Sequence, residues 1–217
     1  MIHLYALVRG LEELPPLTGV DGAALERRQI AGLELVISRA GPKLPETTDK
    51  AVLAHASVVE ELTARSRAIL PARFGRAFAS EEELTAAVET KAPALEHGLS
   101  RVRGCVEFGL RVLGPESPQA STSLSGAEYM RARLEEETVR DRLSGELHRP
   151  LALLARSEAR FGGASGDLLH AAYLVSDERT AAFRDRVAEL ERLHPELTMV
   201  CTGPWPPYSF ADTGEDA

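Results

Sequence analysis

The sequence predicts an α+β protein of two domains, on three observations. Segments with the alternation of strands are interspersed with segments of helical period. Gly104 stands at the point where this pattern restarts. The 217 residues, 44% of them hydrophobic and 27% charged, suffice for one large domain or two small ones. We therefore expect a first domain over residues 1–103, a second over 104–203 and a tail over 204–217.

Composition excludes several classes of partner. The net charge of −8 argues against binding to nucleic acid or to an anionic membrane, since both attract clustered Lys and Arg. No apolar run approaches the ~20 residues of a membrane span, and the start lacks the features of a signal peptide. Cys105 and Cys201 are the only cysteines, and we expect both to remain thiols. These features predict a reduced, cytoplasmic protein.

The first domain is expected to open with a strand and a hairpin. Ile2 to Arg9 is apolar and β-prone, as a central strand would be. After a loop rich in Pro and Gly, residues 23–40 are predicted to form a hairpin that turns near Ala31-Gly32.

A helix should follow from about Thr48 to Arg67. Its apolar residues recur at spacings of four and three, which places them on one face: Val52, Ala56, Val59 and Leu62. His55 falls on the same face. We expect it to be a hydrogen-bonded histidine at the edge of the core rather than a ligand or a catalytic residue.

Residues 68–78 suggest another strand, in which Pro71 must lie at an edge, a start or a bulge. Gly75 suggests a bend or a close approach of the backbone. Ser80 with Glu83 forms a capping box that begins a second helix, and Pro93 should kink or split that helix. The first domain is thus expected to be a mixed sheet with two helices.

The second domain should begin with a strand over residues 105–112. Its alternation predicts that Val106, Phe108, Leu110 and Val112 point inward and that Glu107 and Arg111 point outward. Residues 114–123 form a loop rich in Pro and Ser. Ser125 with Glu128 is a second capping box that opens a long helix, which Pro150 should kink.

Two further strands, residues 155–161 and 168–176, flank a glycine-rich hairpin loop at 162–166. Asp177 can cap the next helix, whose inner face carries Phe183, Val187 and Leu190, and residues 197–202 form the last strand. The order strand, helix, strand, strand, helix, strand is that of the ferredoxin-like βαββαβ motif. Its first and last strands would be antiparallel neighbours, so Cys105 and Cys201 could lie close together.

The tail is the most unusual stretch of the chain. Pro204, Pro206 and Pro207 exclude a helix or a central strand between Thr202 and Phe210. We expect an extended ribbon that displays three aromatic residues in turn: Trp205, Tyr208 and Phe210. The ribbon is either docked on the protein's own body or offered to a partner as a proline-rich ligand.

A search for chemistry finds no catalytic, metal or cofactor signature. The six histidines never fall at i,i+4 or near a cysteine, and no phosphate loop or nucleophile elbow is present. The carboxylates at Glu60, Glu61 and Glu107 cannot be paired as acid and base from sequence. Arg73 could bind an anion or be salt-bridged at a domain seam. We expect no enzyme and no cofactor.

The chain resembles the F/L-type accessory proteins of gas vesicles along nearly its whole length. The most specific matching blocks are Leu70-Pro71-Ala72-Arg73-Phe74-Gly75 and Gly203-Pro204-Trp205-Pro206-Pro207-Tyr208-Ser209-Phe210. Weaker matches are found at residues 2–8, 55–60, 104–109 and 172–175. Phe108 stands where the resemblance leads us to expect Trp, and His170 where it leads us to expect Asn.

The resemblance implies a non-enzymatic protein that contacts the hydrophobic shell subunit of the gas vesicle, and other accessory proteins, during assembly or as a minor structural component. It also implies a modified ferredoxin-like second domain with extra helices. The tail would dock at the domain seam through Trp205, Tyr208 and Phe210, near Arg73, Phe74 and Gly75. Glu60 and Glu107 are possible interaction residues. The alternative is a small-ligand sensor or an enzyme on a ferredoxin-like scaffold, because that fold hosts many functions.

Overall fold

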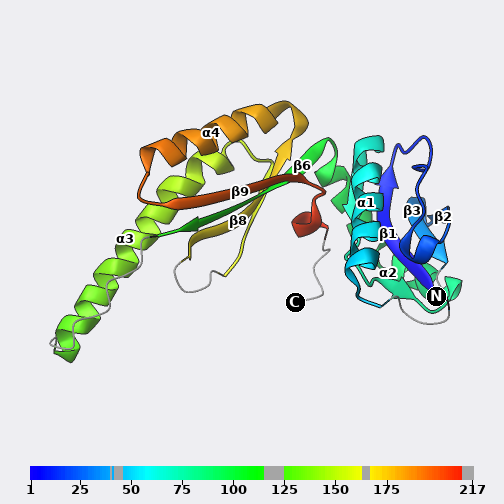
Figure 1. Ribbon diagram of the computed structural model, residues 1–217, viewed down its shortest axis with the longest axis horizontal. Helices are drawn as coiled ribbons and strands as arrows, with labels where there is room; N and C mark the ends of the chain where they lie inside the picture. The colour runs from blue at the N-terminus through cyan, green and yellow to red at the C-terminus, as the bar shows by residue number, and fades with distance from the viewer. Residues whose placement is uncertain (40, 42–45, 115–124, 163–166, 212–217) are drawn as a thin grey trace. The chain divides into compact units, whose positions relative to one another are not determined.

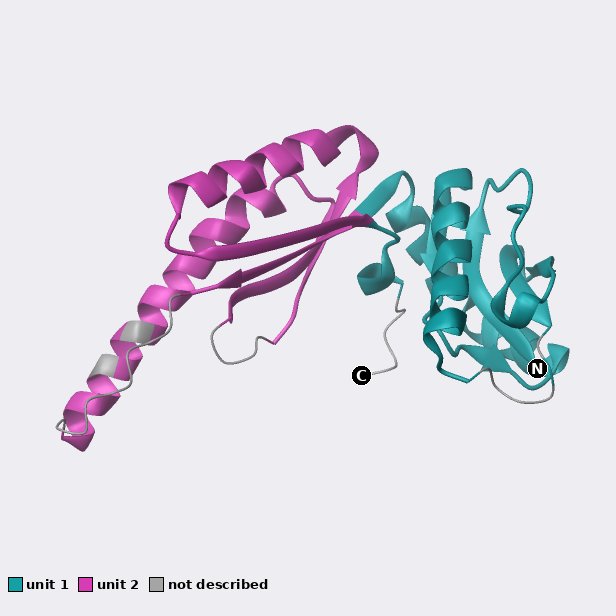
Figure 2. Ribbon diagram, in the orientation of Figure 1, with its two compact units in different colours: residues 1–106, 205–217 teal, residues 107–204 magenta. Residues whose placement is uncertain are grey.

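The computed structural model describes residues 1–39, 41, 46–114, 125–162 and 167–211. The chain divides into two compact units, shown in Figure 2. Unit 1 comprises residues 1–106 and 205–217, and unit 2 comprises residues 107–204. The segment after the last strand therefore belongs with the N-terminal half of the chain. Within the described ranges, no helix is long and apolar enough to cross a membrane.

Unit 1 contains a sheet in the order β2-β3-β1-β4, with β5 also paired to β1 (Figure 1). The strands are β1 (Ile2–Arg9), β2 (Leu25–Ile30), β3 (Leu33–Arg39), β4 (Ala68–Pro71) and β5 (Ala77–Phe78). Each described pair is antiparallel, so the expectation of a mixed sheet is wrong. The crossover through α1 does make β3 and β4 parallel to each other, but β1 lies between them.

The hairpin of β2 and β3 forms where the sequence predicts it. Ala31 and Gly32 both have positive φ, +50° and +78°. A two-residue turn of this kind has the twist that two antiparallel strands need. By contrast, the predicted strand over residues 68–78 is two short strands, β4 and β5, with a loop between them. Pro71 is the last residue of β4. At the end of a strand, the N–H that proline lacks is not needed for a hydrogen bond between strands.

The helix α1 (Asp49–Arg65) begins after Thr48, whose hydroxyl accepts a hydrogen bond from the Ala51 backbone. Its buried residues are Ala51, His55, Val58, Val59 and Leu62. The predicted face is therefore rotated by about one residue, and Val52 is 38% exposed. The rotation places His55, which has polar partners in the core, at the centre of the buried face.

The helix α2 (Glu81–Val102) starts after the predicted cap Ser80, which accepts from the backbone N–H of Glu83. It continues through Pro93, so the predicted split does not occur. Gly98 of α2 lies close to the sheet: a Cβ there would come within 3.1 Å of a Leu70 methyl carbon. This approach brings α2 against β4.

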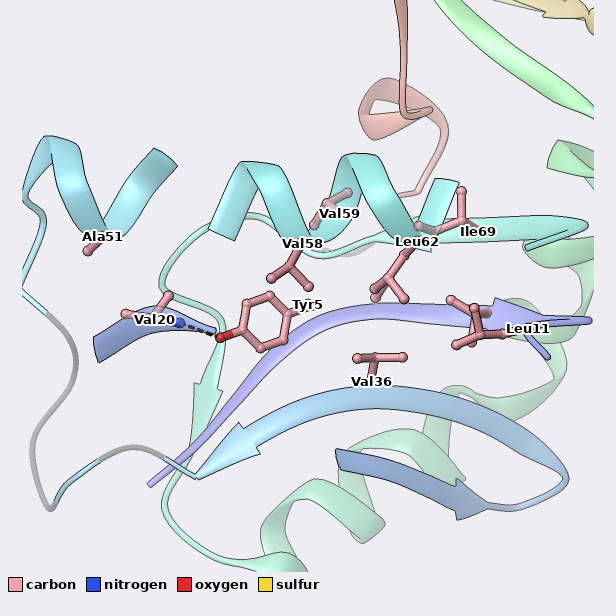
Figure 3. Close-up of a cluster of buried hydrophobic side chains, with 11 residues drawn as sticks. Tyr5, Leu11, Val20, Val36, Ala51, Val58, Val59, Leu62 and Ile69 are labelled. Carbon is pink, nitrogen blue, oxygen red and sulfur yellow. Dashed lines mark hydrogen bonds between the residues drawn. The ribbon is translucent and has the colours of Figure 1, made fainter. Parts of the chain in front are cut away.

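The main core cluster of unit 1 lies between α1 and the sheet (Figure 3). Val58 and Leu62 of α1 face Tyr5, Val36 and other residues of the sheet and its loops, and Val59 belongs to the same cluster. Tyr5 is fully buried, and its hydroxyl accepts a hydrogen bond from the backbone of Val20 at 2.7 Å. The core thus holds one polar aromatic residue whose hydroxyl is paired.

Unit 2 has the predicted order of elements. These are β6 (Cys105–Leu113), α3 (Gly126–Ala152), β7 (Ser157–Arg160), β8 (Asp167–Ser176), α4 (Thr180–Leu193) and β9 (Thr198–Trp205). The sheet order is β7-β8-β6-β9, so β6 and β9 are neighbours and β9 is an edge strand. Phe108 of β6 stacks on Phe183 of α4, with 5.0 Å between ring centroids. Cys105 and Cys201 remain thiols.

Several details of unit 2 differ from expectation. Glu107 is 9% exposed rather than outward-facing, although Arg111 is exposed as predicted. Asp177 opens a short 3-10 turn (Asp177–Arg179) before α4 and makes no side-chain cap. The helix α3 carries the complete capping box of Ser125 and Glu128 and continues through Pro150 to Ala152. The predicted loops at 114–123 and 162–166 lie almost wholly outside the described residues.

Candidate functional site

A pocket of about 320 Å³ opens in unit 1 beside the C-terminal segment. Four parts of the fold form it: the sheet, the loop after β4, one face of α2 and the turn at residues 208–211. The lining residues are Leu4, Leu7, Leu70, Pro71, Ala72, Arg73, Phe74, Gly75, Arg76, Phe78, Ala87, Val88, Lys91, Leu95, Tyr208 and Ala211. We call this the loop pocket, after the loop at residues 71–76.

Backbone hydrogen bonds fix the loop at residues 71–76. The N–H of Ala72 donates to the Tyr5 carbonyl at 2.8 Å, and the N–H of Leu4 donates to the Arg76 carbonyl at 2.9 Å. Gly75 has a φ of +88°, which favours glycine, and a Cβ there would meet nothing within 4 Å. Gly75 therefore serves the predicted bend and not a close approach.

Two buried histidines lie beneath this loop. Nε2 of His3 is 2.9 Å from Nδ1 of His55, and Nε2 of His55 is 2.9 Å from the Ala72 carbonyl oxygen. The ring of Phe74 lies 5.8 Å from each imidazole, measured between centroids. The histidines thus hold both the backbone and one side chain of the pocket loop. His55 is hydrogen-bonded, in agreement with its predicted role.

The hydrogen bonds define the tautomers of the pair. A carbonyl oxygen only accepts, so Nε2 of His55 carries the proton and its Nδ1 is an acceptor. Nε2 of His3 must then donate to that Nδ1. Burial lowers the pKa of both histidines, and burial together with the charge of a protonated His55 lowers the pKa of His3 to about 4. Both rings are therefore neutral at pH 7.

The C-terminal segment docks on unit 1 through two of its three aromatic residues. Tyr208 packs against the core cluster and lines the loop pocket. Phe210 is 3% exposed, and Nη2 of Arg101 donates to its carbonyl at 2.6 Å. Residues 208–210 form a short 3-10 turn rather than an extended ribbon.

Trp205 does not pack as predicted, because its side chain is 48% exposed. The neighbouring Pro206 and Pro207 are buried in its place. Trp205 is the last residue of the edge strand β9, before the chain bends into the turn at Tyr208. The two prolines form the buried part of that bend, and the indole is left at the surface.

The loop pocket combines apolar walls with positive charge. Arg73, Arg76 and Lys91 are among its lining residues, whereas none of the described lining residues is acidic. The guanidinium of Arg76 lies 5.5 Å from the centroid of the Phe78 ring. Burial, together with the nearby charge of Glu60, raises the pKa of Tyr208 to about 12, so this phenol is neutral at pH 7. The pocket is therefore suited to an apolar group beside a negative charge.

The structure brings together some of the predicted site residues and separates others. Arg73, Phe74, Gly75 and Tyr208 line one pocket, and Glu60 lies near Tyr208. Glu107, by contrast, is a buried residue of unit 2. The predicted packing of the tail at a seam between the two domains stays a prediction.

The sequence did not reveal His3 or the contribution of α2 to the pocket. The strand carrying His3 reads as uniformly apolar, and Lys91 on α2 reads as an ordinary surface charge. Within the described ranges, no group of His, Cys, Asp and Glu could hold a metal ion.

Comparison with known proteins gives a consistent result. A family model described as "Gas vesicle synthesis protein GvpL/GvpF" matches residues 1–212. The chain is similar to gas vesicle protein F2 of Halobacterium salinarum, with 29% identity covering 97% of the chain and 92% of that protein. It is similar to gas vesicle protein L of a Streptomyces species, with 30% identity covering 76% and 70% respectively.

Two solved structures have the same fold as the chain. The crystal structure of the gas vesicle protein GvpF from Anabaena sp. matches with a TM-score of 0.81 at 18% identity, covering 97% of the chain and 95% of that structure. That of GvpF from Microcystis aeruginosa matches with a TM-score of 0.78 at 20% identity, covering 97% and 98%.

Proposed function

Because the chain belongs to the GvpL/GvpF family of gas vesicle synthesis proteins, which take part in gas vesicle formation, we propose that it is a non-enzymatic accessory or minor structural component of the vesicle. In this role it binds the hydrophobic shell subunit and supports assembly together with other accessory proteins. Its place of action is the cytoplasm and the gas vesicle.

The observation that carries the proposal is the loop pocket, with apolar walls from the sheet and α2. A protein that handles a very apolar subunit must cover apolar side chains without aggregating itself. A concave site of this kind can cover them, while the net charge of −8 keeps the rest of the surface soluble. We propose that a segment of the shell subunit enters the loop pocket.

The domain organisation enters the same proposal. We propose that residues 1–103 and 104–203 are separate domains, that the second is a modified ferredoxin-like domain, and that the tail from residue 204 onward docks on the protein's own body. The order β7-β8-β6-β9 supports the ferredoxin-like assignment. The burial of Phe210 supports the docked tail.

Two alanines of α2 offer a matched test. Ala87 lines the loop pocket, whereas its neighbour Ala86 is exposed and does not. The experiment immobilises tagged shell subunit and measures how much of the wild-type protein, of Ala87→Arg and of Ala86→Arg it retains from a cell extract. We expect Ala87→Arg to lose at least about tenfold in retention, since about 1.4 kcal/mol of lost binding free energy suffices for that, and Ala86→Arg to match wild type. Wild-type retention no greater than that of an unrelated protein of similar charge would refute shell-subunit binding. Equal retention of both variants would refute the assignment to this pocket.

A second candidate is a small-ligand sensor or enzyme. The observation in its favour is that three cations line a pocket whose volume lies in the small-molecule range. Inorganic phosphate and simple carboxylates are suitable probes in a thermal-shift titration. A saturable rise in Tm that Ala87→Arg abolishes and Ala86→Arg preserves would support this candidate, and no rise at millimolar probe would exclude it for these ligands.

A further inference from the structure

The first half of α3 is a helix without neighbours in the described part of the chain. From Gly126 to Val139, every residue whose exposure is described is exposed. Figure 1 shows this half of α3 extending beyond the four-stranded sheet of its unit. Among the residues of α3 whose exposure is described, Ser144 is the first that is buried. We call residues 126–139 the helical arm. Most of the stability of a helix in a protein comes from packing of one of its faces. The helical arm has no such packed face among the described residues, so a partner would stabilise it.

One face of the arm carries an apolar seam. Ala127, Met130 and Leu134 follow one another at spacings of three and four, which places them on one side of a helix. Met130 is 56% exposed and Leu134 59% exposed. The seam is narrow, because Tyr129 and Val139, the other apolar residues of the arm that the structure describes as exposed, lie on different faces.

Charged residues border the seam in an ordered way. With about 100° of rotation per residue, Arg131 and Glu135 lie on one side of Leu134, at about 60° and 100° from it. Glu137 and Arg133 lie on the other side at the same two angles. Each side of the seam thus has one cation and one anion. On the first side the cation, Arg131, is the charge nearer the seam, and on the second side the anion, Glu137, is the nearer one.

This order discriminates between two orientations of a pair of arms. In an antiparallel pair centred on Leu134, the same side of each helix meets its own copy. Arg131 then lies about 3 Å along the axis from Glu135 of the second copy, at ~1.5 Å of rise per residue. Arg133 and Glu137 meet in the same way. Glu135 and Arg133 also come within about 3 Å of their own copies along the axis, but these two like-charge pairs lie farthest from the seam, against four opposite-charge pairs nearer to it. In a parallel pair, opposite sides meet, so the four nearer pairs join like charges, Arg131 with Arg133 and Glu135 with Glu137, and only the two outer pairs, Glu135 with Arg133, join opposite charges.

We propose that the helical arm binds the helical arm of a second copy of this chain, antiparallel, with the two-fold axis at Leu134. Attractive charge pairs outnumber repulsive ones in this orientation, and the reverse holds in the parallel one. A symmetric pairing of one surface with itself is also the commonest kind of homo-oligomeric interface.

The length of the arm fits this pairing. With the axis at Leu134, Gly126 of one copy lies level with Arg142 of the other, which is exposed. The overlap ends before Ser144, where α3 becomes buried against its own unit. The arms therefore meet over their full length. At each end the overlap passes Arg140, whose Nη2 donates to the Asp167 carbonyl of β8 at 3.0 Å, on a different side of the helix from the seam.

Pairing of this kind is weak, since each copy contributes few apolar residues and the interface is below standard size. We expect a monomer–dimer equilibrium with a Kd on the order of 0.1 mM. Such an affinity joins copies only where they are concentrated, as on a common assembly. This inference does not rest on binding of the shell subunit.

The test reverses single charges and then mixes the variants. Sedimentation equilibrium of the full chain measures the Kd of dimerisation, at concentrations up to about 0.5 mM. This is a few times the Kd expected for so small an interface. Arg131→Glu and Glu135→Arg each place like charges opposite one another twice in the dimer. Each variant alone should dimerise at least about tenfold more weakly than wild type. An equimolar mixture should recover the wild-type Kd, because the carboxylate introduced in one chain then meets the guanidinium introduced in the other.

Mixing separates the proposal from an effect inside one helix. Arg131 and Glu135 are also i,i+4 neighbours, so each reversal weakens its own helix, and a second chain cannot repair that loss. Arg149→Glu reverses a charge on the buried half of α3 and should leave the Kd unchanged, and circular dichroism checks that each variant is folded. A wild-type chain that stays monomeric at about 0.5 mM, several times the expected Kd, or a mixture no tighter than the single variants, would overturn the proposal.

Discussion

His3 and His55 share a hydrogen bond of 2.9 Å between Nε2 of the first ring and Nδ1 of the second, in the interior of unit 1. His55 also donates a hydrogen bond from Nε2 to the carbonyl oxygen of Ala72, in the loop that lines the pocket. One short chain of polar atoms therefore links the first strand, the first helix and the candidate binding site.

The first prediction concerns pH. The folded pKa of His3, about 4, lies below the ordinary value of 6.5, so between these values the unfolded chain binds a proton that the folded chain does not. The contribution of the neutral His3 ring to the free energy of unfolding is fully present above pH 6.5. It is lost as the pH decreases toward 4. The loss from His3 should be roughly 3 kcal/mol over that window, with a further loss in the same direction from His55.

Urea unfolding at pH 7 and pH 5 measures this difference. His3→Leu should reduce the difference between the two values, whatever its effect at pH 7 alone. The control is His97→Gln, which removes an exposed histidine and should preserve it. A wild-type free energy of unfolding that is the same at both pH values would refute the prediction.

The second prediction separates the aromatic residues of the tail. Phe210 is 3% exposed, whereas Trp205 is 48% exposed. Phe210→Ala should therefore lower the free energy of unfolding by about 3–5 kcal/mol. Trp205→Ala should lower it by less than about 1 kcal/mol, as at other surface positions. Thermal and urea unfolding measure the loss of stability in each variant. A larger loss for Trp205→Ala than for Phe210→Ala would contradict the structure.

The third prediction concerns the hydroxyl of Tyr5, which accepts a hydrogen bond from the Val20 N–H and lies 2.9 Å from Oγ of Ser38. Tyr5→Phe leaves these buried groups without that partner, at a cost of about 1–3 kcal/mol. Tyr129→Phe removes the same atom from an exposed ring and should change stability by less than about 0.5 kcal/mol. Equal effects in chemical denaturation would count against the network.

The fourth prediction contrasts two glycines, neither with a heavy atom within 4 Å of an added Cβ. Gly75 has a φ of +88°, so Gly75→Ala should cost about 1–2 kcal/mol. Gly145 lies inside α3, where Gly145→Ala should stabilise by about 0.5–1 kcal/mol. Opposite signs of the change in Tm are expected, and the same sign for both would be inconsistent with the loop geometry.

Local signals predicted much of the fold. Ser80 and Ser125 begin helices as their capping boxes indicate, and the Ala31-Gly32 turn forms as its composition suggests. These features depend only on residues near one another in sequence, which is why they can be read from sequence alone.

The errors arise where long-range contacts decide. Hydrophobic spacing placed Val52 on the inner face of α1, but the polar partners of His55 turn that face toward Ala51 and Val58. Strand alternation placed Glu107 outside, although it is buried. For Trp205, composition gave no sign of which of three neighbouring aromatic residues would be left at the surface.

The docking of residues 208–210 on unit 1 has a consequence for synthesis. Most of that unit is made from residues 1–106, yet Tyr208 and Phe210 pack on it from the far end of the sequence. A ribosome releases the N-terminal part first, so the growing chain holds an unfinished unit while all of unit 2 is translated. The packing of unit 1 can be completed only after residues 208–210 have left the ribosome. A fully packed unit 1 therefore indicates that the chain has been translated at least to Phe210.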